Sequence, residues 1–360
     1  MGFLRNASFL IYGSKHFGRR GYERASATWD NSIMERRLDG QVAMVTGANQ
    51  GLGFQVSQEL ARRGCTLFMV CRNAQRGEEA VQHVRQASGN QDVHLQLCDV
   101  SSLASIHQLV RQWEAAGRPL HLLVNNAGIL VHDYAPSADG YESCFATHTL
   151  GAWALTWALG PLLRGSAPAR VVFVSSGGMY TAPLEVKHLA NDDMAPPAAP
   201  NGAGGAGRAT AAGRGKYDGM LCYSRDKRRQ VALAERFAEL WGPQGVLVLS
   251  MHPGWATTEG VKRSIPDFYS FFRNSFRDVA QGADTVVWLA LQDASRLQPG
   301  AFYLDRAPQP LHLPLAGTQY GMQQVDAMWA QLQGMCAGKL QPVRVGQEEQ
   351  REGEGAKTVG

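Results

Sequence analysis

From about residue 40 onward, short apolar runs alternate with longer segments of helical length, and this alternation constrains the fold more than any other feature of the chain. Runs that are apolar along most of their length are typical of strands in a parallel sheet buried on both faces. Intervening helices supply the two covering layers. We therefore predict one doubly wound α/β domain. The candidate strands are VAMVT (42–46), TLFMVC (66–71), VHLQL (93–97), LHLLVN (120–125), RVVFVSS (170–176), VLVLSM (246–251) and AFYLD (301–305).

Composition divides the 360-residue chain further. We expect the α/β domain to span residues 39–315. Within it, residues 194–216 are almost all Ala, Gly, Pro and Arg, and so few large apolar side chains predict a flexible surface insert. The other predicted parts are an N-terminal arm (1–38), a C-terminal helical extension (316–345) and a disordered tail (346–360).

The N-terminal arm is basic. Its first 22 residues include Arg5, Lys15, Arg19 and Arg20 and contain no acid, together with the apolar piece FLIYG. A mitochondrial presequence, a helix that binds a membrane surface and an irregular arm all fit this pattern. We expect an intracellular protein, with cytoplasm and mitochondrion both open. No apolar run approaches the roughly 20 residues that a membrane-spanning helix needs.

Charge and cysteine spacing exclude several kinds of site. A formal net charge of +4 gives no case for nucleic-acid binding, which needs a concentrated basic face. The six cysteines show no CxxC spacing, so we expect buried free thiols and no metal site.

The first candidate strand leads into the glycine-rich stretch TGANQGLG and then into a helical pattern. Glycines in such a turn let the backbone approach a pyrophosphate, and the helix N-terminus offers free N–H groups to it. The domain is therefore expected to be Rossmann-like and to bind a dinucleotide. The residues expected to contact it are Gly47, Asn49, Gln50, Gly51, Leu52 and Gly53.

Two residues at strand ends bear on the choice of cofactor. Arg72 follows the second strand, where an acidic residue would bind a ribose 2′-hydroxyl and a cation suits a 2′-phosphate. This favours NADP over NAD, although a solvated arginine is also compatible. Asp99 follows the third strand and suits either a hydrogen bond to adenine or the start of the next helix.

The stretch YSRDK places Tyr223 and Lys227 four residues apart in a helical pattern. They share one arc with Val231, Ala234, Ala238 and Trp241, whereas the opposite arc carries Arg225, Arg228, Arg229, Arg236 and Glu239, which we expect to be a charged face.

A lysine on an apolar stripe requires a reason. One explanation is that its side chain extends past the helix end to solvent. The functional explanation is that the ammonium lowers the tyrosine pKa, so that the phenol exchanges a proton with a substrate oxygen. Ser175 and Ser176, which end the fifth strand, are suited to binding the same oxygen or simply to turn formation.

Taken together, TGANQGLG, NNAG, VVFVSS, YSRDK and HPGWATT resemble, in type and order, the motifs of the short-chain dehydrogenase/reductase family over about residues 40–310. The resemblance implies that Tyr223 is the catalytic acid/base and that Lys227 binds the nicotinamide ribose. It implies that Ser176 orients the substrate carbonyl. Residues implied to line the cofactor cleft are Asn126, Gly128, Pro253, Gly254 and Thr258.

The sequence departs from the family pattern twice. FATHTLG places His148 where the family commonly has an asparagine that holds a proton-relaying water, and histidine is also able to move protons. Ser176 and Tyr223 are also unusually far apart, which the predicted insert explains, because loop-closure entropy grows only slowly with length.

The segment after HPGW suggests a lipophilic substrate. Its aromatic residues suit the wall of an apolar pocket, but they equally suit the core or a membrane-surface patch. These residues are Phe268, Tyr269, Phe271, Phe272 and Phe276.

The leading prediction is an NADP-dependent oxidoreductase that interconverts a small, lipophilic carbonyl and alcohol. Family members often form dimers, so a homodimer is also expected, and weak contact with a membrane surface stays open. Two alternatives are a non-catalytic nucleotide-binding sensor or scaffold and a Rossmann-like methyltransferase, the latter leaving the Tyr/Lys stripe unexplained.

Overall fold

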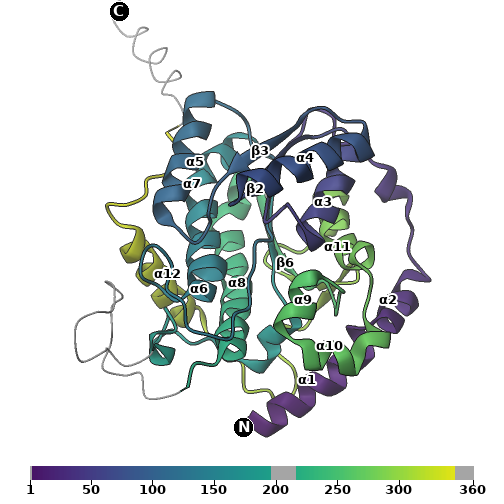
Figure 1. The fold of residues 1–360 in the computed structure, drawn as a ribbon, viewed down its shortest axis with the longest axis vertical. Helices are drawn as coiled ribbons and strands as arrows, with labels where there is room; N and C mark the ends of the chain where they lie inside the picture. Colours follow the sequence, from purple (N-terminus) through teal and green to yellow (C-terminus); the bar gives the residue numbers. More distant parts are fainter. Residues whose placement is uncertain (1, 196–215, 345–360) are drawn as a thin grey trace, which may run out of the picture.

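The computed structural model describes residues 2–195 and 216–344, and its centre is an eight-stranded sheet (Figure 1). The strand order is β3-β2-β1-β4-β5-β6-β7-β8, and all neighbours are parallel except β7 and β8. The chain winds outward from β1 in one direction and from β4 in the other, which confirms the predicted doubly wound sheet. The strands are β1 (Val42–Thr46), β2 (Thr66–Cys71), β3 (Val93–Leu97), β4 (Leu122–Asn125), β5 (Ala169–Val174), β6 (Val246–Met251), β7 (Phe302–Leu304) and β8 (Ala307–Gln309).

The seven predicted strands all form, and only β4, β5 and β7 have shifted ends. β4 begins two residues later than predicted, and β5 ends two residues earlier, so that both serines of RVVFVSS lie beyond the strand. The last strand, β8, was not predicted. It is three residues long, contains Pro308 and lies at the sheet edge, so no apolar run marks it.

Helices cover both faces of the sheet, and each face has its own hydrophobic core. The face with α3, α4 and α11 packs against alternate strand residues such as Val45 and Leu249. The opposite face carries α5, α7 and α8, with α12 packed outside α7 and α8. The helices are α1 (Gly2–His16), α2 (Arg19–Ser26), α3 (Gly51–Arg62), α4 (Ala74–Ser88), α5 (Leu103–Ala116), α6 (Ser143–Phe145), α7 (Ala152–Gly165), α8 (Gly219–Trp241), α9 (Glu259–Ser264), α10 (Pro266–Phe272), α11 (Val279–Leu291) and α12 (Met322–Cys336).

Local signals set several helix ends. Asn73 caps α4 by accepting a hydrogen bond from the Arg76 amide, and the left-handed Gly89 ends that helix. Asp278 and Gln281 form a capping box at the start of α11. These short-range interactions explain why the helices begin and end close to the strands that they cover.

Two predicted segments fall largely or wholly outside the described residues. The insert predicted at 194–216 is described only at its ends, and the tail predicted at 346–360 is not described. The division of the chain into arm, domain, extension and tail therefore stays a prediction. Within the described part, α12 falls in the range predicted for a helical extension.

The predicted charged face of α8 is wrong at two of its arginines. Arg228 and Arg229 are fully buried. Arg229 donates to Asp226, to Asn191 and to the carbonyl oxygen of Glu185. Since Asn191 and Glu185 come from the segment between β5 and α8, helical periodicity alone gave no sign that this face is covered.

The N-terminal arm forms two helices that pack against the domain. Phe17 is buried and meets the His252 ring edge-on at 4.4 Å. The Arg277 guanidinium, which is paired with Asp305, donates to the backbone oxygens of His16 and Gly18. The buried Arg277–Asp305 ion pair therefore helps to hold the backbone between α1 and α2 in place.

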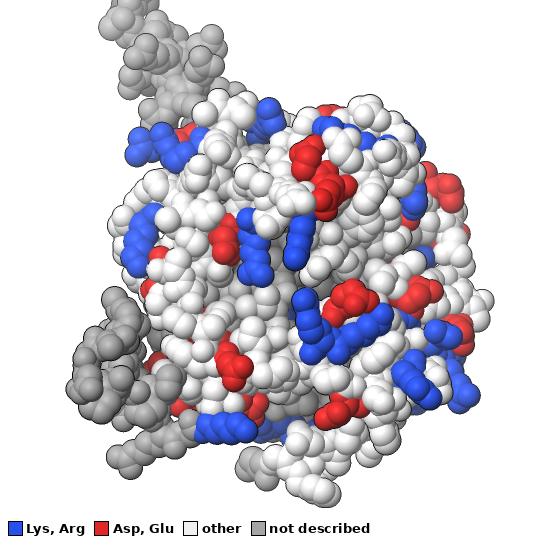
Figure 2. All heavy atoms as spheres, viewed as in Figure 1, with Lys and Arg blue, Asp and Glu red and all other residues white. Residues whose placement is uncertain are grey.

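All six cysteines are free and buried, as predicted. Across residues 2–195 and 216–344, no helix is long and apolar enough to cross a membrane. On the face shown in Figure 2, acidic and basic side chains are interspersed, although basic ones gather over α2.

Candidate active site

The predicted cofactor loop lies at the carboxyl edge of the sheet, where strand order reverses between β1 and β4. Open α/β sheets bind their ligands at this switch point. The turn from β1 into α3 contains Gly47 and Gly51, both with positive φ (64° and 56°). A side chain on Gly53 would place its Cβ 2.4 Å from both the Gly47 carbonyl oxygen and the Asn126 amide nitrogen. The loop therefore holds this close packing only with glycine at that position.

The start of α3 is suited to an anion. Gln50, at the N-cap, makes no side-chain hydrogen bond to the first turn, so the amides there are left for an external acceptor. Asn49 is half-buried in the turn, and Leu52 packs against the core beneath it. The loop thus offers a phosphate both backbone donors and a positive helix end.

Arg72 and Asp99 differ in their hydrogen bonds: Asp99 accepts hydrogen bonds from Ser101, whereas Arg72 is exposed. The Arg72 side chain is exposed just beyond β2. Asp99 accepts hydrogen bonds from the backbone and hydroxyl of Ser101, while the cap of α5 is Ser102. Asp99 therefore forms a turn three residues before the cap and is not the cap itself. Its predicted hydrogen bond to adenine stays a prediction.

Asn126 ties the loop after β4 to β1. Its side chain donates to the Thr46 carbonyl, and the Thr46 hydroxyl accepts from the Asn126 and Ala127 amides. Gly128 follows, and a Cβ there would lie 3.0 Å from the His148 ring. This loop therefore connects the glycine turn to the helix that carries His148.

The loop after β6 lies at the same carboxyl edge of the sheet as the glycine turn. Gly254 has φ of 75° and packs against the Arg277 side chain. Thr258 caps α9 by accepting from the Val261 amide, and its methyl group lies 3.5 Å from where a Gly51 side chain would begin. Pro253 immediately precedes this turn. The loop after β6 and the glycine turn are thus neighbours, although about 200 residues separate them.

Tyr223 and Ser176, two of the predicted catalytic residues, lie next to each other. Their hydroxyls share a hydrogen bond. Ser176 also accepts from the Gly178 amide, which orients its hydroxyl at the start of the turn after β5. The imidazole of His148 stands perpendicular to the Tyr223 ring, with ring centres 5.4 Å apart. The fold therefore brings three of the four predicted catalytic side chains into direct contact.

Lys227 is the fourth predicted catalytic residue, and it lies next to the Tyr223 ring. It is buried, and its ammonium lies 5.5 Å from the centre of the Tyr223 ring. The ammonium donates to the Val174 carbonyl at 2.9 Å and to the Gln230 side-chain oxygen at 3.0 Å. An ammonium has three N–H donors, so one is left for a further acceptor. The alternative, a lysine that extends to solvent past the helix end, is wrong.

Gln230 was not singled out from the sequence. Its amide nitrogen donates to the His148 carbonyl at 3.1 Å while its oxygen accepts from Lys227. It therefore joins the lysine to the π-helical turn Ala146–Gly151 that carries His148. Its place three residues after the lysine in KRRQ was the available signal, since i and i+3 side chains share a helix face.

Burial changes the proton affinities of this group. It raises the pKa of Tyr223, only partly offset by the hydrogen bond from Ser176, and it lowers the pKa of Lys227 to about 7. Without a bound cofactor, the net shift of the Tyr223 pKa is therefore upward, because burial outweighs the hydrogen bond from Ser176. The lowering of this pKa by Lys227 stays a prediction.

His148 is a neutral ring with a fixed tautomer. Burial holds its pKa well below the usual value. Its Nε2 accepts a hydrogen bond from the Ile129 amide, so the ring proton is on Nδ1. Through Nε2 the side chain therefore holds the turn after β4, while Nδ1 has no hydrogen-bond partner among the described residues.

The aromatic residues of the segment after β6 differ in burial. Phe276 is a core residue, and Phe268 and Phe272 pack on Trp255 beside the N-terminal arm. Phe271 is 82% exposed. The core alternative therefore holds for Phe276, whereas the pocket wall and the membrane-surface patch stay predictions.

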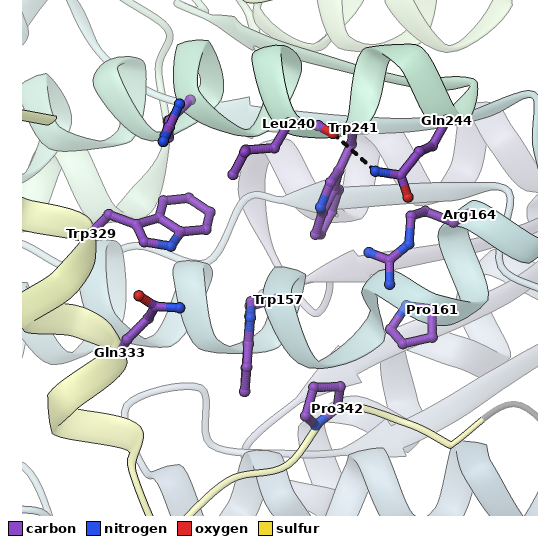
Figure 3. Close-up of a pocket in the computed structure, with 10 residues that line it drawn as sticks. Trp157, Pro161, Arg164, Leu240, Trp241, Gln244, Trp329, Gln333 and Pro342 are labelled. Carbon is purple, nitrogen blue, oxygen red and sulfur yellow. Dashed lines mark hydrogen bonds between the residues drawn. The ribbon is translucent and has the colours of Figure 1, made fainter. Parts of the chain in front are cut away.

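A groove of about 490 Å³ lies away from the predicted site, between α7, α8 and α12 (Figure 3). Trp157, Trp241 and Trp329 wall it, and Arg164 lies over the Trp241 ring. None of the predicted site residues lines it. The groove is therefore separate from the group around Tyr223.

Known proteins resemble this chain over most of its length. The family model described as short chain dehydrogenase matches residues 41–185. Human dehydrogenase/reductase SDR family member 12 is 37% identical over 317 residues, which are 88% of this chain and 92% of that protein. Human retinol dehydrogenase 11 is 29% identical over 271 residues, 75% of this chain and 78% of that protein.

Solved structures share the fold. A crystal structure of an uncharacterised protein from Mycobacterium paratuberculosis has a TM-score of 0.62 and 24% identity, and the match covers 85% of this chain and 96% of that one. The Pseudomonas aeruginosa RhlG/NADP active-site complex has a TM-score of 0.55 and 20% identity over 74% of this chain and 94% of that one. The matched family model and the identity across nearly the whole chain show that this protein belongs to the short-chain dehydrogenase/reductase family of oxidoreductases.

Proposed function

We propose that this oxidoreductase uses NADP(H) to interconvert a carbonyl and an alcohol on a small, lipophilic substrate, with Tyr223 as the acid/base. The observation that carries the proposal is the contact of Tyr223 with Ser176 and with the buried ammonium of Lys227. A pair of hydroxyls converging at one point suits a carbonyl or alcohol oxygen, which accepts one hydrogen bond from each.

The residues present fit a dinucleotide phosphate. The first-turn amides of α3 and the glycines at 47, 51 and 53 would hold the pyrophosphate, and Arg72 would pair with a 2′-phosphate. Asn126 and Gly128 on one side and Pro253, Gly254 and Thr258 on the other would border the nicotinamide half. When bound, the cofactor supplies or accepts the hydride.

The chain's own groups handle the proton. Tyr223 would donate a proton to the substrate oxygen while Ser176 holds that oxygen in place. The third N–H of Lys227 would bind a ribose hydroxyl. Since Nε2 of His148 is already occupied, we infer that Gln230 and the His148 carbonyl position the lysine, and that the imidazole itself does not shuttle protons.

The test is a search for turnover with the full chain. Because Phe17 packs beside the turn after Ser176, removing the N-terminal arm would disturb the site. NADPH oxidation is followed spectroscopically with a panel of lipophilic aldehydes and ketones, and binding of NADPH is measured separately. Turnover on at least one carbonyl is expected. Tight NADPH binding without turnover on any of them would instead support the non-catalytic sensor or scaffold.

Replacing Arg72 is expected to change the cofactor preference. Arg72→Asp removes a cation and places an anion near the 2′ position, so NADPH affinity should fall by about tenfold or more relative to NADH. Titration of both cofactors measures the ratio. Arg62→Asp, the same charge change at the far end of α3, should leave it unaltered. An unchanged ratio in Arg72→Asp would remove this residue from the cofactor site.

Burial of Lys227 predicts a pH-dependent stability. Its pKa is about 7 when folded and 10.5 ordinarily, so between these values the unfolded chain binds the extra proton. The contribution of this group to folding stability therefore rises with pH across the window by about 1.4 kcal/mol per unit and is lost as pH falls through 7.

Lys227→Met isolates that contribution, since methionine fills similar space without titrating. The difference in unfolding free energy between wild type and variant, measured by denaturant titration without cofactor from pH 7 to 9.5, should change with this slope. A difference that does not vary with pH would mean that the lysine is solvated.

A further inference from the structure

Helix α1 has apolar side chains on two faces. On the inner face, Phe9 and Tyr12 pack with Phe17 in the cluster beside the turn after β5. The outer face carries Phe3 and Leu4 and, seven residues on, Leu10 and Ile11. A spacing of seven brings these pairs onto one stripe of the helix. The inner face explains how α1 binds the domain, but nothing in the described chain covers the outer one.

Two further side chains extend the exposed stripe. Leu315, 76% exposed, is flanked by residues whose carbonyls accept hydrogen bonds from Ser8 and Arg5 of α1. Phe271, 82% exposed, belongs to α10, which lies beside α1 in Figure 1. Trp255 links the two helices, since it meets both Phe272 and Gly13.

These six residues form what we term the apolar end of the molecule. Ten large hydrophobic side chains are exposed in the described chain, and six of them lie here. Scattered exposed side chains need no explanation, but a contiguous group marks a site of interaction. In Figure 2 the α1 end of the molecule is white, free of charged side chains in this view.

Exposed basic side chains lie on α1 and on the elements next to it. The exposed cations on α1, α2 and the α9–α10 segment outnumber the acids Glu23 and Asp267 on the same elements, and the remaining acid there, Glu259, is paired with Lys262. Figure 2 shows the concentration over α2. None of these cations forms an ion pair within the described residues: Lys15, Arg19, Arg20, Arg24, Arg263 and Arg273.

We propose that the apolar end docks on the surface of an anionic lipid bilayer, with α1 lying in the plane of the interface. Apolar side chains on one side of a helix with cations at the margin are the pattern of an interfacial helix. The cations gain from the negative surface potential of such a bilayer. A second copy of this chain suits the face less well, because a symmetric contact would bring two basic margins together.

Docking would place the site near the lipid. The inner face of α1 reaches Phe17, which packs against Gly177, the residue after Ser176. A substrate dissolved in the bilayer would then have a short route to the site. The proposal does not depend on catalysis, however, because the apolar end and its cations include none of the predicted catalytic or cofactor-binding residues.

The test is sedimentation of the full chain with phosphatidylcholine vesicles, with and without phosphatidylserine, in the absence of cofactor and substrate. Binding to the anionic vesicles is expected to be about tenfold tighter or more, and to weaken in high salt. The double variant Ile11→Ser, Phe271→Ser should reduce that binding by a further factor of about ten. Exposed side chains are replaced, so the unfolding midpoint should stay close to that of the wild type.

A matched control replaces exposed apolar residues elsewhere. Leu97→Ser with Met322→Ser alters β3 and α12 and should bind vesicles like the wild type. Failure of the wild type to bind anionic vesicles, or equal binding by the Ile11/Phe271 variant, would overturn the proposal. Self-association that this variant abolishes, measured by analytical ultracentrifugation without lipid, would assign the apolar end to a second copy instead. NADPH oxidation assayed in solution reports on the proposed activity separately.

Discussion

Tyr223→Phe is expected to lower kcat by roughly 100- to 10,000-fold, the range that a positioned acid/base contributes. The variant keeps the ring that packs against His148 and loses only the hydroxyl bonded to Ser176. NADPH binding should therefore change little. Stopped-flow or steady-state NADPH oxidation gives kcat on a carbonyl turned over by the wild type, and NADPH fluorescence gives the affinity.

Tyr303→Phe is the matched control for this experiment. Its hydroxyl accepts from the Gln298 amide, away from the site, so its loss costs about 1 kcal/mol of stability and leaves kcat within a few fold. A Tyr223→Phe enzyme that turns over at a wild-type rate would refute the role of the phenol. Reduced turnover with equally reduced NADPH binding would assign Tyr223 to the cofactor instead.

Gly53→Ala is expected to weaken NADPH binding by at least about 100-fold, because the new methyl group meets backbone rather than a side chain that can move. Its Cβ would lie 2.4 Å from the Gly47 oxygen, so the glycine turn must open or α3 must shift away from β1. Overpacking of this kind also destabilises a protein by about 1–3 kcal/mol. Both effects are measurable on one sample, by NADPH titration and by denaturant unfolding.

Gly165→Ala separates the local clash from a general effect of replacing glycine. Gly165 ends α7, and nothing lies within 4 Å of where its Cβ would be. That variant should bind NADPH normally and unfold within about 0.5 kcal/mol of the wild type. If Gly53→Ala binds NADPH as tightly as the wild type does, the glycine turn is not the phosphate site.

Much of the fold was predictable because its signals are local. Each apolar strand run forms a strand, and parallel order follows from strands that alternate with helices. The edge strand β8 was missed because a three-residue strand with a proline carries no apolar pattern. The site was predictable where a motif places a side chain at a strand end or on one helix face, as with Ser176 and with Tyr223 and Lys227.

The sequence by itself determines the order of the strands along the chain, the glycine turn and the helix face shared by Tyr223 and Lys227. Each of these features depends on residues close together in the chain, within one or two helical turns or at the end of one strand. Only the tertiary structure decided that Arg228 and Arg229 are buried, that Gln230 reaches the His148 carbonyl, and that Phe17 packs beside the turn after Ser176. Their partners lie tens to hundreds of residues away, and periodicity describes a helix but not what covers it. The tyrosine pKa moves upward for the same reason, since water is excluded from Tyr223 by elements that no single stretch of sequence contains.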